Sequence, residues 1–185
     1  MRSKDTVKAI IRLYCVLGSL AVAAGGGELL PDFINDALGT NAVRRALVLD
    51  EAAGTEVLRI MDGNDPETRV AYWQAAASTA WILQGRGRTG VFTAGFVVYE
   101  GRIVDCRVLE YHESHGRAIK SKRFLRQFRN AGLRDDRQLD RRIDGVTGAT
   151  ISVKSITNLA RLALFLDQIR LRMSDASAGR VNDER

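Results

Sequence analysis

Four segments between Arg69 and Tyr111 most constrain the fold of this chain, because each is rich in Val, Ile, Tyr, Trp and Phe. Short gaps that contain Gly or small residues separate them. Short connections favour antiparallel pairing of neighbouring strands. The Glu-Gly pair between Tyr99 and Arg102 can supply the positive φ of a tight hairpin turn. We therefore predict an antiparallel meander with strands at 69–73, 79–84, 91–99 and 102–111.

Helical patterns flank these strands in the sequence. The stretch 31–64 is rich in Ala, Leu and Glu and ends in the turn-forming run 62–66, so we predict it to be helical. A final helix over 152–173 carries an apolar stripe, and the polar residues from Ser174 indicate a frayed tail. The predicted fold class is α+β, an antiparallel β-sheet (meander) flanked by helices.

A further helix is predicted over 121–130, between the last strand and the final helix. Ser121 is its N-cap, Gly132 follows it, and one face carries Phe124 and Phe128. The other face is basic. The wider stretch 117–142 holds ten Lys or Arg against three Asp, a net charge of +7 that exceeds the +6 of the whole chain. It is either a solvated face or a cationic collar that steers an acidic partner.

The first 24 residues have the order of a secretory signal. Four basic residues precede an apolar stretch at 13–24 that ends in small residues, with cleavage expected after Ala23. A buried N-terminal helix and an uncleaved anchor are the alternatives. The chain is then divided into a signal peptide or anchor at 1–24, a helical segment at 25–66, a main domain at 67–173 and a flexible tail at 174–185.

Composition excludes several classes of protein. No apolar run approaches the ~20 residues that span a bilayer, so a polytopic membrane protein is ruled out. Two Cys and two His form neither a disulfide framework nor a zinc site. Cys106 lies on a predicted strand and is expected to be buried and inert. We expect no metal at His112 and His115. Trp73 and Trp81, on predicted strands, are expected in the core.

The most informative segment lies immediately before the last helix. It is a short polar loop with two glycines and two threonines, Asp144-Gly145-Val146-Thr147-Gly148-Ala149-Thr150. A helix start carries unpaired N–H groups and the positive end of the helix dipole, so a phosphate there would be stabilised. The alternative is that a threonine simply caps the helix and Asp144 is a turn residue.

The loop resembles the flavinylation motif of the FMN-binding domain family, which includes the flavin subunits of sodium-pumping NADH:quinone reductase and of the Rnf complex. In that family the last hydroxyl is esterified to the phosphate of FMN. The resemblance implies covalent FMN on Thr150, with Asp144, Thr147, Gly148 and Ala149 as recognition residues. It implies no catalytic residue in this chain.

A second stretch supports the resemblance, because the family has a strand that ends in Glu, Thr or Ser, a short turn and Gly. Here Glu113 and Ser114 lead through His115 to Gly116, and in the family this turn packs near the flavin. The similarity spans roughly residues 72–169. His115 stands where Pro is frequent and Ser152 where a second Thr is frequent. The chain lacks the longer architecture of the sodium-pump subunit and is similar to a short, stand-alone FMN-binding protein.

The resemblance implies an extracytoplasmic electron-transfer flavoprotein, periplasmic or membrane-associated outside the cytoplasm. A separate flavin transferase that uses FAD and Mg²⁺ would attach the flavin and release AMP. Redox partner proteins, such as a membrane reductase or a cytochrome, would exchange electrons with it. The alternative is a cofactor-free basic protein that binds nucleic acid or an anionic membrane surface. The export signal and the lack of a known nucleic-acid-binding motif argue against a nucleic-acid partner.

Overall fold

The computed structural model describes residues 29–63, 69–112 and 116–181. Its centre is a five-stranded antiparallel sheet in which each strand pairs with the next along the chain. The strands are β1 (Val43–Val48), β2 (Arg69–Ala75), β3 (Ser78–Arg86), β4 (Val91–Tyr99) and β5 (Arg102–Tyr111). The predicted α+β meander is confirmed, and β4 and β5 have the predicted bounds. The β4–β5 hairpin turns at Glu100 and Gly101, with φ of 49° and 70°, as the Glu-Gly pair predicts.

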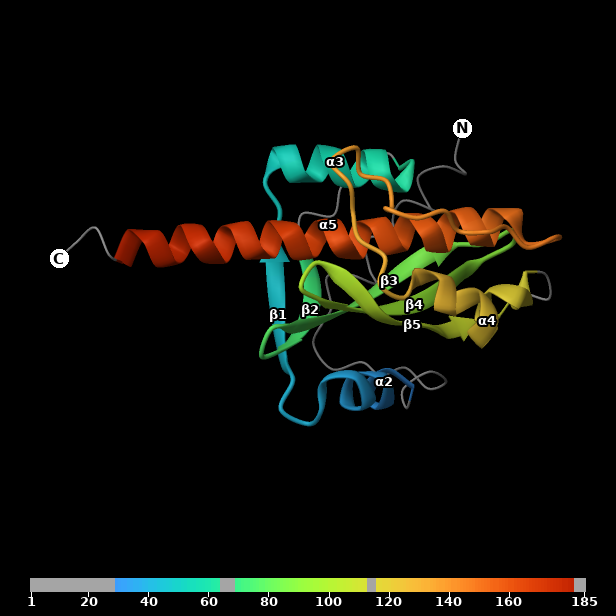
Figure 1. Ribbon diagram of the computed structural model, residues 1–185, viewed down its shortest axis with the longest axis horizontal. Coiled ribbons are helices and arrows are strands. Elements are labelled where there is room, and N and C mark those ends of the chain that lie inside the picture. Colours follow the sequence, from blue (N-terminus) through green and yellow to red (C-terminus); the bar gives the residue numbers. More distant parts are fainter. Residues whose placement is uncertain (1–28, 64–68, 113–115, 182–185) are drawn as a thin grey trace, which may run out of the picture.

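Helices cover both faces of the sheet (Figure 1). The long helix α5 (Thr150–Val181) packs against β3 and β4 on one face, where α3 (Glu51–Met61) packs against α5. Helix α2 (Leu29–Leu38) covers the other face, where Phe33 contributes to a smaller apolar cluster. Strand β4 is therefore buried along seven consecutive residues, as expected for a strand covered on both sides.

The prediction of a helical segment at 25–66 is wrong for its middle part, because β1 lies between α2 and α3. Strand β1 is an edge strand that pairs with β2, and its Leu47 lies opposite Val70. Only Leu47 is buried in β1. With one inward side chain, the strand has almost no alternation of apolar and polar residues to reveal it, and pairing with β2 decides its conformation.

Two other helix predictions need correction. The segment predicted as one helix over 121–130 is two short pieces, α4 (Lys122–Leu125) and η2 (Arg126–Phe128), and a further short helix, η1 (Arg117–Lys120), precedes it. Ser121 does cap α4, as predicted, through a hydrogen bond from the Phe124 N–H. The last helix begins at Thr150 and continues to Val181, so it extends into the region predicted as a frayed tail from 174.

Two further observations bear on the sequence predictions. Among the described residues, no helix has both the length and the apolar character that crossing a membrane requires. The expected signal or anchor at 1–24 lies outside the described residues. Trp81 is fully buried and stacks on Tyr72, with ring centroids 4.8 Å apart, whereas Trp73 is half-buried beside the smaller cluster.

Candidate flavin site at the start of helix α5

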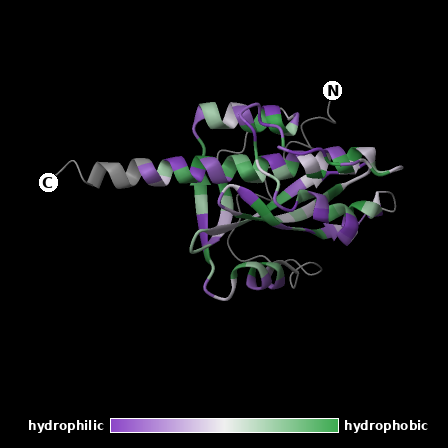
Figure 2. Cartoon of the chain, viewed as in Figure 1, coloured by the Kyte–Doolittle hydropathy of each residue, from purple (hydrophilic) through white to green (hydrophobic). Residues whose placement is uncertain are grey.

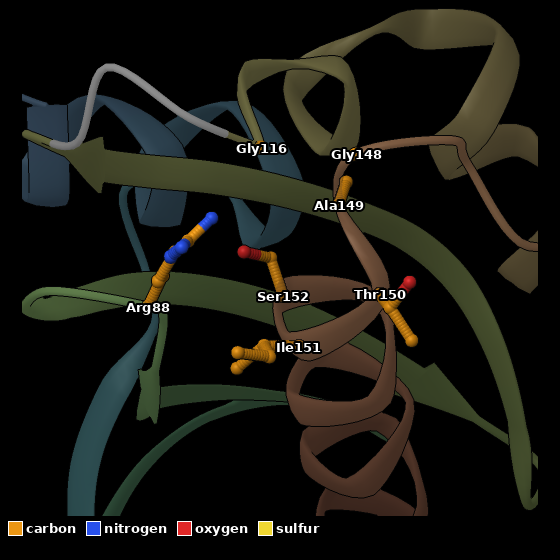
Figure 3. Close-up of a pocket in the computed structure, with 7 residues that line it drawn as sticks. All are labelled: Arg88, Gly116, Gly148, Ala149, Thr150, Ile151 and Ser152. Atoms are coloured by element: carbon orange, nitrogen blue, oxygen red, sulfur yellow. The ribbon is translucent and has the colours of Figure 1, made fainter.

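A pocket of about 200 Å³ opens at the first turn of α5. It brings together residues from the β3–β4 turn, the end of the turn after β5, and the loop that leads into α5. Its lining residues are Arg88, Gly116, Gly148, Ala149, Thr150, Ile151 and Ser152 (Figure 3). Segments that are more than 60 residues apart in the sequence therefore meet at one helix terminus.

Two glycines with left-handed backbone shape this pocket. Gly148 has a φ of 78°, and no atom lies within 4 Å of the position that its Cβ would take. Gly116 has a φ of 77°, but a Cβ there would overlap the hydroxyls of Tyr111 and Ser152. Gly148 thus allows the loop to turn tightly while leaving open space, and Gly116 lets the chain pass close to the start of α5.

The start of α5 presents backbone donors to this pocket. The first i to i−4 hydrogen bond runs from the Val153 N–H to the Ala149 carbonyl at 2.8 Å. The N–H groups of Thr150, Ile151 and Ser152 therefore have no acceptor within the helix. Such groups, with the positive end of the helix dipole, favour an anion.

The hydroxyls near this terminus differ in their surroundings. Thr147 and Thr150 are exposed, and neither hydroxyl has a hydrogen-bond partner among the described residues. The N-cap alternative for these threonines is therefore not what the structure has, although Asp50 caps α3 in that way. The Thr150 side chain lies at the pocket rim and is directed away from Arg88, whereas Ser152 points toward it (Figure 3).

Hydrogen bonds fix the first turns of α5 to the ends of the strands. The hydroxyls of Ser152 and Tyr111 lie 3.1 Å apart, and both side chains are buried. One turn further along, the Ser155 Oγ accepts a 2.9 Å hydrogen bond from the Arg86 N–H at the end of β3. The helix start is thus held against β3 and β5.

The structure brings together only part of the predicted site. Gly148, Ala149 and Thr150 line the pocket, whereas Asp144 and Thr147 are exposed outside its lining. The Asp144 N–H donates to the Gln127 Oε1 at 2.7 Å, which holds the beginning of the loop against η2. The predicted residues Glu113 and Ser114 lie outside the described residues, as does His115. Gly116, which follows them, does line the pocket.

Arg88 and Ile151 line the pocket but were not named in the sequence analysis. Arg88 lies in the turn between β3 and β4, in the run Gly85-Arg86-Gly87-Arg88-Thr89-Gly90. It is the only charged residue among those that line the pocket. The only signal in the sequence is an arginine within a glycine-rich turn, which by itself does not indicate that the turn lies beside α5.

The other candidate groups have ordinary surroundings. Cys106 is buried, and burial, with a smaller contribution from the Asp105 carboxylate, raises the pKa of its thiol well above the usual value. The expected burial of Cys106 is confirmed. His112 is exposed at the end of β5. Within the described parts of the chain, no group of three or more His, Cys, Asp or Glu side chains is placed to hold a metal ion.

The fold and site together define a class of protein, a small α+β domain with an anion-favouring pocket at the start of its longest helix. Residues 87–164 match the family model of the FMN-binding domain. The match begins at the β3–β4 turn and includes every residue of the pocket. A comparison with curated proteins gave no match. The family match supports FMN as the cofactor and electron transfer as the general function.

The pocket fits the phosphate end of FMN better than the whole cofactor. Its volume is about 200 Å³, below the ~300–1,000 Å³ of pockets that enclose a small-molecule ligand. The uncapped N–H groups and Arg88 suit a phosphate. A flavin whose phosphate bound here would have its ring outside this pocket.

Proposed function

We propose that this protein is an extracytoplasmic electron-transfer flavoprotein that carries FMN through a phosphoester bond to Thr150. One observation carries the proposal. An exposed threonine hydroxyl with no hydrogen-bond partner among the described residues lies at the uncapped start of α5, at the rim of the pocket, within the matched FMN-binding domain. The α-helices α3 and α4, by contrast, have side-chain caps from Asp50 and Ser121.

Accessibility favours Thr150 over the other hydroxyl on this turn. Ser152 is 3% exposed, and its Oγ is within hydrogen-bond distance of the Tyr111 hydroxyl. A modifying enzyme must bring a phosphorus atom to the attacking oxygen, which a buried hydroxyl does not allow. Thr147 is also exposed but does not line the pocket. A phosphate on Thr150 would remain beside the N–H groups of the first turn.

The attachment balances with FAD as the donor. The Thr150 Oγ loses its proton and forms a bond to the phosphorus of the FMN half, while the P–O bond to the other half breaks and AMP leaves. A separate Mg²⁺-dependent flavin transferase would supply the catalytic groups, so Thr150 acts as its substrate. After attachment, the N–H groups of the first turn of α5 would hold the phosphate. FMN supplies reversible one- and two-electron chemistry, which needs no catalytic base from this chain.

The small pocket explains why a covalent bond would be useful. A pocket that holds only the phosphate end buries little of the cofactor. Because noncovalent affinity depends on how much of the ligand the protein contacts, such a pocket alone would bind FMN weakly. Outside the cytoplasm a lost flavin is not easily replaced. The signal-like order of residues 1–24 supports that location, and a membrane reductase or a cytochrome would complete the electron path.

The test is to produce the full chain with a flavin transferase and to export it. We expect an intact mass with one added FMN, flavin fluorescence that survives acid precipitation, and peptide mapping that places the flavin on Thr150. Thr150→Ala should abolish the label, and Thr150→Ser should retain it because the nucleophile remains. Thr55→Ala, which removes a threonine hydroxyl from α3, serves as the matched control and should be labelled normally.

Two outcomes would contradict the proposal. If the wild-type chain stays unlabelled while the same transferase labels another substrate, the proposed covalent attachment is wrong. A colourless protein that binds DNA in a salt-sensitive way would favour a cofactor-free basic binding protein. Cell fractionation tests the location separately, because a processed, labelled protein in the extracytoplasmic fraction is expected.

A further inference from the structure

Five exposed basic side chains gather on one short segment of the surface. This basic surface consists of Arg117, Lys120, Lys122, Arg123 and Arg126, all on η1, α4 and η2. None of the five has a carboxylate partner among the described residues. In Figure 2 hydrophilic residues predominate on α4, whose place is given in Figure 1.

Of the other five basic residues at 117–142, four make contacts within the molecule, and Arg142 is exposed without a partner among the described residues. Arg134 pairs with Asp136 at 2.7 Å, and Arg137 lies 3.5 Å from the Glu56 carboxylate and over the Phe165 ring. Arg141 donates to two backbone carbonyls. The positive charge without a partner is therefore concentrated on the basic surface. The interpretation of the whole stretch 117–142 as one solvated face does not apply to the residues that make contacts within the molecule.

The basic surface is built on a fixed support. Ile119, Phe124 and Phe128 from the same segment are almost fully buried, and the two phenylalanine rings meet edge to face at 5.6 Å. With its apolar side chains inward, the segment can only present its charged side chains outward. Ser121 caps α4 and fixes the break between the short helices.

The same segment adjoins the pocket at one end and contacts the loop that leads into α5 at the other. Gly116, which precedes η1, lines the pocket, and Gln127 of η2 accepts from the N–H of Asp144. In Figure 3 the chain that continues from Gly116 lies close to Gly148. At the pocket itself, the apolar side chain of Ile151 is 52% exposed. The basic surface therefore adjoins a pocket whose lining includes an exposed apolar residue.

We propose that the basic surface docks an acidic redox protein beside the flavin. This inference rests on the proposed function and names the chemistry of its partner, a protein with carboxylates around its own cofactor. Complementary charge raises the rate of encounter and orients a transient complex without requiring a large interface. A bilayer is a poorer fit, because adsorbed helices insert apolar side chains and this segment buries its own.

Charge reversal tests the location of docking. The flavin-loaded full chain is titrated with a plant-type [2Fe–2S] ferredoxin as the acidic probe, with binding followed by calorimetry. The variant Lys122→Glu/Arg123→Glu/Arg126→Glu should raise the Kd about tenfold and flatten its dependence on salt. The control Arg45→Glu/Arg69→Glu/Arg172→Glu makes the same charge change at exposed positions on β1, β2 and the far part of α5, and should change the Kd little.

Lysine chemistry gives a second readout that does not depend on the flavin. The described residues include three lysines, Lys120, Lys122 and Lys154, and Lys154 pairs with Asp62 at 2.9 Å. A carbodiimide activates a probe carboxylate, a lysine Nζ attacks it, and an amide forms as the urea leaves. Cross-links should map to Lys120 and Lys122. Lys120→Arg/Lys122→Arg should lose them while the Kd is unchanged, because the charge remains.

Several results would overturn the inference. Equal weakening by the two charge-reversal variants would mean that only net charge matters, and cross-links mainly to Lys154 would place docking elsewhere. A third result is binding of the wild-type protein to vesicles of phosphatidylcholine with phosphatidylglycerol. If this binding is tighter than the binding to ferredoxin and is lost in the first charge-reversal variant, the surface binds a membrane. If the wild-type chain carries no flavin on Thr150 after exposure to the transferase but still docks ferredoxin at Lys122, the proposed attachment is refuted. The proposed docking surface is then still supported.

Discussion

The hydroxyls of Tyr111 and Ser152 lie 3.1 Å apart, in a buried contact between the last residue of β5 and the first turn of α5. The two residues are 41 positions apart in the sequence. Because Thr150 and Ser152 share one helical turn, the contact also sets where the Thr150 side chain lies. It connects the stability of the sheet with the geometry of the flavin site.

Removing one of these hydroxyls should destabilise the protein. Tyr111→Phe leaves the buried Ser152 hydroxyl without this partner and should lower the free energy of unfolding by about 1–3 kcal/mol. Adding Ser152→Ala should cost less than the sum of the single changes, because the orphaned group is gone as well. Urea unfolding of the four proteins in the cycle measures the coupling, and strictly additive effects would mean that the contact contributes nothing.

The two glycines Gly116 and Gly101 should respond differently to alanine, although both have positive φ. At Gly101 no atom lies within 4 Å of a Cβ, so alanine should cost about 1–2 kcal/mol of backbone strain. At Gly116 the added Cβ would also overlap the Tyr111 and Ser152 hydroxyls, and the cost should reach about 2–5 kcal/mol. Thermal unfolding compares them. Flavin loading should fall for Gly116→Ala alone, and equal effects at the two sites would contradict the crowding argument.

The Cys106 thiol should be protected in the folded protein. Burial first, and the nearby Asp105 carboxylate second, raise its pKa well above the usual value, so very little thiolate forms at neutral pH. In a Cys15→Ser background, iodoacetamide at pH 8 should label Cys106 only after unfolding in urea. Rapid labelling of the native protein, followed by mass spectrometry, would contradict this.

Asp140 should make the protein sensitive to acid. Burial raises its pKa, but the Gly132 N–H and the Arg102 guanidinium outweigh burial and hold the pKa below its usual value. A lowered pKa in the folded state means that this stabilisation is present above the unfolded pKa of about 3.9 and is lost as pH falls through the folded pKa. Asp140→Asn should lower the free energy of unfolding by about 1–2 kcal/mol at pH 7. The expected loss is smaller than for a fully buried ion pair because the site is partly exposed.

The pH dependence supplies the control for this prediction. Urea unfolding from pH 7 to pH 2 should show the difference between wild type and Asp140→Asn shrinking below pH 4. A difference that stays constant through this range would assign the effect of the substitution to packing and not to the charge of Asp140.

Local sequence predicted those parts of the fold whose causes are local. Strands β4 and β5 had the right bounds because their residues fit a pleated, buried surface and a Glu-Gly turn separates them. Ser121 was recognisable as a cap because the capping bond spans three residues. The burial of Cys106 followed from its place on a strand. The domain limits and the role of residues 1–24 stay predictions.

Other features depended on partners that are distant in the sequence. Strand β1 exists because β2 offers it an edge, and its own residues carry no clear alternation. The helix predicted over 121–130 breaks because the chain must follow β5, where the Ile103 N–H donates to the Ala131 carbonyl. No count of propensities over a short window contains those constraints.

The sequence by itself determined the meander and the motif that ends in Thr150, because turn geometry, strand preference and a seven-residue pattern act over short distances. Only the tertiary structure decided that Arg88 and Gly116 meet this motif, that Ser152 is buried against Tyr111, and that the basic side chains left unpaired lie beside the pocket. Those relationships arise when the sheet and α5 pack together and bury apolar surface. Packing joins residues without regard to their separation along the chain.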